Sequence, residues 1–186
     1  MIGMPSVQRT PEPFMPQYLW IGCSEIGIPI NQIIGVTEKE LCIHQNLANM
    51  FSPSDVGCLS ILQYSVERLG VRDIIVCGHY GCRAVAAALE DSQSALFGNW
   101  LRPVHELIQA HKALIADTVL PSKRLDRICE LNVIEQSRRL CQTTIVSNAW
   151  ARAQKLSVHG WIYDPRDGLL HNLFHTDGFS CAHPSL

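Results

Sequence analysis

A histidine and a cysteine three residues apart, His79 and Cys82, could together bind a metal ion. Gly78 precedes the histidine and Gly81 precedes the cysteine, and glycines let the backbone bend around a bound ion. Zinc takes such nitrogen and sulfur ligands, and a site with three protein ligands keeps one position for chemistry. Cys23, at the end of an apolar run, is the third candidate ligand. The alternative is that His79 and Cys82 are an ordinary core pair.

The sequence contains eight cysteines, and their expected state depends on the compartment. The first residues lack the charged start and apolar centre of a secretory signal, so we expect a cytoplasmic protein with reduced thiols. A redox pair of Cys77 and Cys82 is disfavoured, because the spacing is not C-x-x-C and Cys77 lies inside an apolar run. Outside the candidate ligands, we expect helical core positions for Cys58, Cys129 and Cys141, and a terminal tail for Cys181.

The other histidines are interpreted as structural or surface residues. His44 alternates with Cys42 in an expected strand, and His105 and His111 lie in a helical pattern on an expected solvated face. For the C-terminal histidines the sequence reveals no partner, although an exposed histidine can shuttle protons near neutral pH. These residues are His159, His171, His175 and His183.

Apolar patterning predicts strands alternating with helices. Asp55 is a good N-cap for a helix that Gly70 ends, and Pro121 suits the first turn of a longer helix. The expected strands are 18–23, 40–46 and 74–77, followed by a C-terminal hairpin that turns at 164–168. The expected helices are 55–70, 82–90, 99–116, 121–141 and 144–155.

This order predicts an α/β fold, with a mainly parallel sheet flanked by helices and an antiparallel hairpin at one edge. Ligands bind beyond the carboxyl ends of parallel strands, where Cys23 ends the first strand and His79 follows the third. We expect a proline-rich arm over 1–17, a single zinc-binding domain over 18–175 and a tail over 176–186.

Composition excludes several classes of protein. The 186 residues include 47% hydrophobic and 17% charged residues, which argues against disorder. The formal net charge is −2 and no basic cluster is present, so we expect no nucleic-acid partner. Charged residues interrupt the apolar stretches well before the roughly 20 residues of a membrane span, so we expect no membrane partner either.

Five segments resemble the β-class carbonic anhydrases in order and spacing: YLWIGCSE, IHQNLANM, CLSILQYSVERLG, IIVCGHYGC and HGWIYD. The resemblance covers Tyr18 to about Phe174. It implies that Cys23, His79 and Cys82 hold Zn²⁺, and that a zinc-bound hydroxide hydrates CO2 reversibly to bicarbonate. It also implies a homodimer or a dimer of dimers.

The sequence departs from the family's C-S-D-S-R motif, because Glu25 replaces the aspartate and Gly27 replaces the arginine. In the family the arginine holds the carboxylate away from zinc. Without that cation, Glu25 would either bind zinc as a fourth ligand or take up a proton. Arg83, which follows Cys82, is a candidate replacement partner for Glu25, and the alternative is that it points to solvent. Gln45 stands where the family commonly has another arginine.

Two functions of different classes follow from these residues. The first is a carbonate dehydratase-type zinc lyase, with turnover that the altered motif reduces or abolishes. The second is a catalytically silent zinc-binding homologue, closed by Glu25, that acts as a structural or binding protein. The same chemistry would also serve a related small substrate such as COS or CS2.

Overall fold

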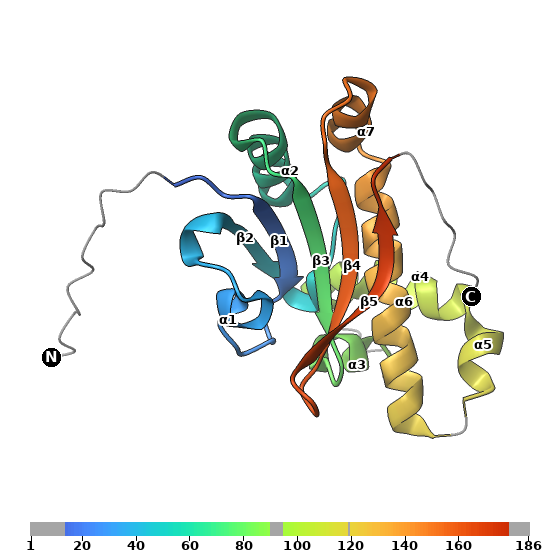
Figure 1. Cartoon of the computed structure of the whole chain (residues 1–186). Coiled ribbons are helices and arrows are strands. Elements are labelled where there is room, and N and C mark those ends of the chain that lie inside the picture. Colours follow the sequence, from blue (N-terminus) through green and yellow to red (C-terminus); the bar gives the residue numbers. More distant parts are fainter. Residues whose placement is uncertain (1–13, 90–94, 119, 179–186) are drawn as a thin grey trace, which may run out of the picture.

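The computed structural model describes residues 14–89, 95–118 and 120–178. The part of the proline-rich arm before residue 14, Cys181 and His183 lie outside these residues. Five strands form one sheet in the order β2-β1-β3-β4-β5 (Figure 1). The pairs β2–β1, β1–β3 and β3–β4 are parallel, and β4–β5 is antiparallel, which confirms the predicted fold class. The strands are β1 (Tyr18–Cys23), β2 (Leu41–Asn46), β3 (Asp73–His79), β4 (Ser157–Asp164) and β5 (Leu169–Thr176).

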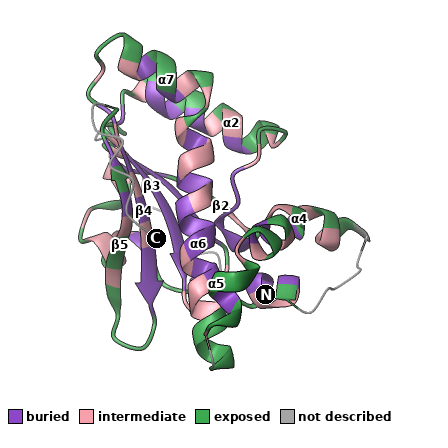
Figure 2. Ribbon diagram, turned by 90° about the vertical axis from the view of Figure 1, so that its right-hand side faces the viewer, coloured by how far each residue is buried: buried purple, intermediate pink, exposed green. Residues whose placement is uncertain are grey.

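Helices cover both faces of the sheet. The α-helices are α1 (Ile30–Ile34), α2 (Val56–Gln63), α3 (Arg83–Leu89), α4 (Ala95–Ala110), α5 (Lys112–Ala116), α6 (Pro121–Cys141) and α7 (Thr144–Ala151). Short 3₁₀ turns, η1 (Glu38–Glu40) and η2 (Leu47–Asn49), flank β2, and a π-helical segment, η3 (Tyr64–Leu69), continues α2. Figure 2 shows α6 running along one face of the buried strands. On the other face, Trp20 and Ile75 pack with Ile30 of α1.

The predicted helix boundaries hold where local chemistry sets them. The Asp55 side chain accepts a hydrogen bond from the backbone N–H of Cys58 at 3.0 Å, as an N-cap does. Gly70 ends the same helical stretch with a φ of 67°, in the left-handed region that favours glycine. Pro121 occupies the first turn of α6 as predicted.

Several elements differ from the prediction, including α4, which begins at Ala95 instead of residue 99. The pattern at 99–116 is two helices that meet at His111, because the second helix turns to bury Ile115 against the core. The last predicted helix ends at Ala151 instead of residue 155, and the short helix α1 was not predicted. Strand β3 continues through Gly78, so that His79 is its last residue instead of following it. In the described part of the chain, no helix is both long and apolar enough to cross a membrane.

Glycines in β3 and β4 let α6 lie close to the sheet. A Cβ atom at Gly78 would lie 2.6 Å from a methyl carbon of Val133 on α6. At Gly160 it would lie 2.7 Å from the Ser137 hydroxyl and 2.9 Å from Cβ of Phe174. Real Cβ atoms do not approach other atoms so closely, so both positions require a residue without a side chain.

We expect Gly160→Ala to lower the free energy of unfolding by about 1–3 kcal/mol, because the added methyl group overpacks the contact between α6 and the sheet. Urea unfolding followed by circular dichroism measures this change. Gly57→Ala is the matched control, since Gly57 is exposed on α2 and alanine favours helix. An equal loss of stability in both variants would contradict the close-packing explanation.

Candidate metal centre

Four potential ligands meet at the carboxyl ends of β1 and β3. Cys23 is the last residue of β1, His79 is the last residue of β3, and Cys82 lies on the turn that enters α3. Glu25 joins them from the turn after β1, and one ligand atom of each residue lies within 4.8 Å of every other. Parallel pairing of β1 with β3 makes these strand ends neighbours, so residues far apart in sequence come together.

The sulfur–sulfur distance suits zinc. Sγ of Cys23 lies 3.8 Å from Sγ of Cys82, and both side chains are buried. Two thiolates about 2.3 Å from one tetrahedral zinc ion would lie about 3.8 Å apart. A disulfide would require about 2.05 Å, so the observed spacing is that of two ligands and not of a bonded pair.

The imidazole of His79 is oriented as a ligand. Its Nδ1 lies 3.1 Å from the Tyr80 carbonyl oxygen, which can only accept a hydrogen bond, so Nδ1 carries the proton. The opposite nitrogen, Nε2, is buried and has no hydrogen-bond partner among the described residues. A carbonyl that fixes the tautomer in this way is typical of metal-binding histidines. The donor set and the unsatisfied Nε2 therefore fit zinc.

The two sulfurs share one proton more readily than they hold two. The pKa of Cys23 is lowered to about 4, chiefly by a hydrogen bond from the Cys82 thiol and to a lesser extent by His79 and the Glu25 backbone N–H, against the opposing effect of burial. The Cys23 thiolate in turn raises the pKa of Cys82. Burial lowers the pKa of His79, but the adjacent Cys23 sulfur outweighs burial and the net shift is upward. The cluster thus attracts positive charge, as a cation site does.

Glu25 is held beside the sulfurs by the start of α3. Its Oε2 accepts hydrogen bonds from the backbone N–H groups of Arg83 at 2.9 Å and Ala84 at 3.4 Å. The same oxygen lies 3.6 Å from Sγ of Cys82. The Arg83 guanidinium Nε lies 3.5 Å from Oε1, although the Arg83 side chain is 87% exposed. Arg83 therefore both faces solvent and contacts the carboxylate. The two backbone amides add a second restraint on Glu25, which residue types and spacing did not predict.

The other altered motif positions have local roles. Gly27 has a φ of 68°, a conformation that L side chains rarely adopt. Gln45 donates a hydrogen bond from Nε2 to the Cys23 carbonyl oxygen at 3.4 Å, so it supports the end of β1. Neither residue supplies a cation to Glu25.

Three further cysteines, Cys58, Cys77 and Cys129, are buried outside the cluster of four potential ligands. Cys77 is buried on the sheet face that α1 covers, and burial raises the pKa of its thiol. Cys58 and Cys129 are buried helical residues, as predicted, and burial raises the pKa of each to about 12. These thiols resist ionisation at neutral pH, which makes redox chemistry at Cys77 unfavourable.

A buried polar network, missed by the sequence analysis, positions the turn beside Cys23. Ala48 and Asn49 on this turn have positive φ values of 62° and 46°. Asn132 on α6 donates to the Ala48 carbonyl oxygen at 2.9 Å, and Gln136 accepts from the Phe51 backbone N–H at 3.0 Å. The two amide side chains also bond each other at 2.9 Å. Asn132 and Gln136, polar residues on the apolar face of a predicted helix, were the available signal of this network. Their backbone partners are more than 80 residues away in the sequence, so spacing does not identify them.

A second unpredicted network holds the residue next to His79. The Tyr80 hydroxyl donates to Glu130 at 2.7 Å, and the Arg166 guanidinium lies 4.8 Å from the Tyr80 ring centre. Arg166 also donates to Asp164 at 2.7 Å and to Asp126 at 3.1 Å. This network ties the hairpin turn and α6 to the loop that carries the metal cluster.

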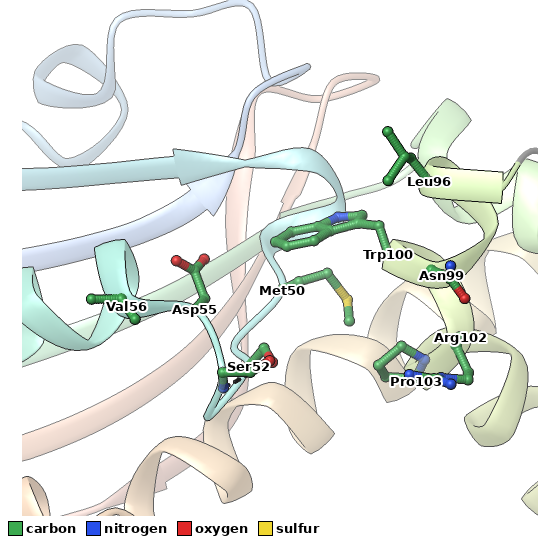
Figure 3. Close-up of a pocket in the computed structure, with 10 residues that line it drawn as sticks. Met50, Ser52, Asp55, Val56, Leu96, Asn99, Trp100, Arg102 and Pro103 are labelled. Atoms are coloured by element: carbon green, nitrogen blue, oxygen red, sulfur yellow. Dashed lines mark hydrogen bonds between the residues drawn. The ribbon is translucent and has the colours of Figure 1, made fainter.

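A hollow of about 610 Å³ lies between the loop after β2 and α4 (Figure 3). Met50, Asp55, Leu96 and Trp100 are among its lining residues, and the Trp100 indole donates to the Leu47 carbonyl oxygen at 2.9 Å. None of the four cluster residues lines it, although Met50 belongs to the same buried group as Cys23. The hollow is therefore separate from the four potential ligands at the strand ends.

The expectation that the C-terminal histidines have no partner is wrong for three of them. His159 lies 2.8 Å from Asp73, His175 lies 3.2 Å from His159, and His171 lies 3.6 Å from Asp167. Strand pairing creates the first two contacts, and sequence spacing does not reveal it. His44, which we expected to be structural, has its Nε2 3.4 Å from the Asn46 amide and 4.0 Å from the Asp55 carboxylate.

Comparison with known proteins identifies the family. The carbonic anhydrase family model matches residues 18–170. A carbonic anhydrase of Emericella nidulans is 36% identical over 158 residues, which cover 85% of this chain and 69% of the relative. A β-carbonic anhydrase of Coccomyxa superposes with a TM-score of 0.82 at 34% identity, over 88% of this chain and 75% of that chain. A tetrameric β-carbonic anhydrase of Sordaria macrospora superposes with a TM-score of 0.83 at 31% identity, over 87% of this chain and 83% of that chain. The chain therefore belongs to the β-carbonic anhydrase family.

Proposed function

We propose that this protein is a zinc-dependent carbonic anhydrase that interconverts CO2 and bicarbonate, with Cys23, His79 and Cys82 as the zinc ligands. The observation that carries the proposal is the pair of sulfurs 3.8 Å apart beside the buried, unbonded Nε2 of His79. When bound, zinc would lower the pKa of a coordinated water far below that of bulk water and so supply a hydroxide nucleophile.

The chain's own residues prepare the site for that chemistry. Two thiolates and a neutral imidazole would balance the charge of Zn²⁺. The ligands and the ion together would then carry no net negative charge to oppose the negative charge that develops in the reaction. Ala48 and Met50 belong to the same buried group as Cys23 and Cys82, and they help to keep bulk water away from the two sulfurs. Glu25, restrained at the start of α3, is placed to accept a hydrogen bond from the nucleophile. Two sulfur donors leave zinc less electrophilic than imidazoles would, so activity should favour alkaline pH.

The second candidate is a closed, catalytically silent zinc protein with Glu25 as fourth ligand. One observation favours it: Oε2 of Glu25 lies 3.6 Å from Sγ of Cys82. An oxygen and a sulfur that share one tetrahedral zinc ion would also lie about 3.6 Å apart. The amide hydrogen bonds to the same oxygen favour the open site instead, because they already satisfy Oε2 without a metal.

Stopped-flow CO2 hydration by the zinc-loaded protein tests the proposed function. We expect catalysis, about one zinc ion per chain by elemental analysis, and inhibition by acetazolamide, the compound bound in the Coccomyxa relative. The same protein assayed with COS and CS2 distinguishes the related substrates. A zinc-loaded protein without CO2 hydration would overturn the proposal and favour the silent homologue. We also propose a homodimer or a dimer of dimers, which sedimentation velocity measures.

Arg83→Ala is expected to lower the CO2 hydration rate by only about two- to fivefold, because an exposed ion pair contributes about 0.2–1 kcal/mol. The backbone amides of α3 would still hold Glu25. Arg83→Lys should recover part of the loss with zinc content unchanged, and Arg152→Ala, at an exposed arginine beyond α7, is the control. An unchanged rate in Arg83→Ala would remove Arg83 as a positioning residue.

A further inference from the structure

Two histidines lie side by side on the sheet face opposite α6, away from the cysteine cluster. His159 on β4 and His175 on β5 are direct cross-strand partners in the antiparallel pair. Their Nδ1 atoms are 3.2 Å apart, and their ring centres are 4.8 Å apart. Gly160, the neighbour of His159, faces Val133 and Ser137 of α6, so the alternation of a strand places His159 on the other face.

An irregularity in β5 helps to build this arrangement. The pairing shifts between Gly160 and Trp161, so that Trp161 pairs with Asn172 while His159 pairs with His175. Asn172 and His175, three residues apart, therefore both lie beside the same face of β4. Bulges of this kind redirect side chains and are frequent next to functional sites.

Asp73 determines which nitrogen of His159 is available. The carboxylate Oδ1 lies 2.8 Å from Nε2 of His159, and an ionised carboxylate can only accept a hydrogen bond. Nε2 of neutral His159 therefore carries the proton, and Nδ1 presents a lone pair toward His175. A carboxylate that holds one nitrogen of a histidine orients the ring so that the other nitrogen can bind a metal ion.

Nδ1–H of His175 donates to Nδ1 of His159, and the spacing of these two nitrogens also fits two ligands of a tetrahedral ion. Two imidazole nitrogens about 2.0–2.1 Å from one zinc ion would lie about 3.3–3.4 Å apart. The observed 3.2 Å is close to this separation. A square-planar ion would bring adjacent nitrogens to about 2.9 Å, so the geometry favours zinc over copper.

A cavity of about 410 Å³ opens onto the pair, lined by His159, Trp161, Leu170, Asn172 and His175. It has room for the waters that would complete the coordination of an ion with two protein ligands. The metal cluster lies at the other end of the sheet, because Asp73 begins β3 and His79 ends it. His159 pairs with Ile75, four residues before His79, so about 13 Å of strand separates the two sites and they do not share ligands.

We propose that His159 and His175 bind a second zinc ion through their Nδ1 atoms, with Asp73 as the residue that orients His159. On binding, the ring proton of His175 moves from Nδ1 to Nε2, so both ligands are neutral imidazoles and no redox step is involved. The ion would link β4 to the edge strand β5.

Zinc titration of the metal-loaded protein by isothermal calorimetry, with zinc content as a second readout, tests the proposal. We expect the unmodified protein to take up one more zinc equivalent than His175→Gln, which changes an exposed side chain and should fold normally. Asp73→Asn should keep the site but weaken its affinity at least about tenfold, as loss of an orienting carboxylate does.

His171→Gln is the matched control, since His171 lies on the same strand beside Asp167 and not at the pair. The extra equivalent should persist in this variant. Its persistence in His175→Gln, or its absence from the unmodified protein, would overturn the proposal. The result does not depend on CO2 hydration, because the comparison counts a zinc equivalent between two proteins with the same cysteine cluster.

Discussion

Cys82→Ser is expected to lose bound zinc and to lower the CO2 hydration rate by at least about 10³-fold. The sulfur of Cys82 lies 3.8 Å from that of Cys23, the separation that two ligands of one zinc ion require. Serine keeps the shape of the side chain but replaces a thiolate with a hydroxyl that stays protonated at neutral pH. Without zinc, the pKa of water returns to about 15.7, so the nucleophile is lost. Elemental analysis and stopped-flow hydration measure the two effects.

Cys42→Ser provides the control for this experiment. Cys42 is also buried, but it lies in β2 among the apolar residues of α2 and α7. The variant should keep zinc and activity while it loses stability from the buried hydroxyl group. If Cys82→Ser retained about one zinc ion per chain and its full rate, the proposed ligand set would be wrong.

Glu25→Ala is expected to lower the hydration rate by about 10²-fold with zinc retained, because loss of one preorganised hydrogen-bonding group costs about 10²–10³-fold. The Glu25 carboxylate is held by the Arg83 and Ala84 amides at the start of α3, where it would accept a hydrogen bond from the nucleophile. Stopped-flow rates and zinc content check this result. Glu25→Gln, which keeps the shape and removes the charge, should show a similar loss.

The direction of the change distinguishes the open site from the closed one. If Glu25 were the fourth ligand, its removal would free a coordination position and the rate would rise instead of falling. A higher rate in Glu25→Ala would therefore contradict the proposed role of Glu25 and favour the silent homologue. Loss of zinc in this variant would also identify Glu25 as a ligand.

Restoring the family's aspartate–arginine pair by Glu25→Asp with Gly27→Arg is a poor test of the same question. Gly27 has a φ of 68°, so an arginine there would cost about 1–2 kcal/mol in backbone strain. The shorter aspartate would also fall short of the amides that Glu25 reaches. In this chain the Glu25 carboxylate already contacts the backbone N–H of Arg83 and the Arg83 guanidinium.

Much of the fold follows from local patterns. The boundaries of β1 and α6 match the prediction residue for residue, because an apolar run ends at Cys23 and a proline begins the helix. The division of 99–116 into two helices was not predictable in this way. It depends on how Ile115 packs in a buried group drawn from several elements.

The sequence by itself determined the α/β order and the candidate ligands Cys23, His79 and Cys82, because residue type and strand position are local properties. Tertiary structure alone decided what holds Glu25, since its partners belong to a helix more than 50 residues away. It also decided that Asp73, His159 and His175 form a cluster, because strand neighbours in a sheet are chosen by packing. Pairing across strands converts distant residues into contacts, and no spacing rule along one chain contains that information.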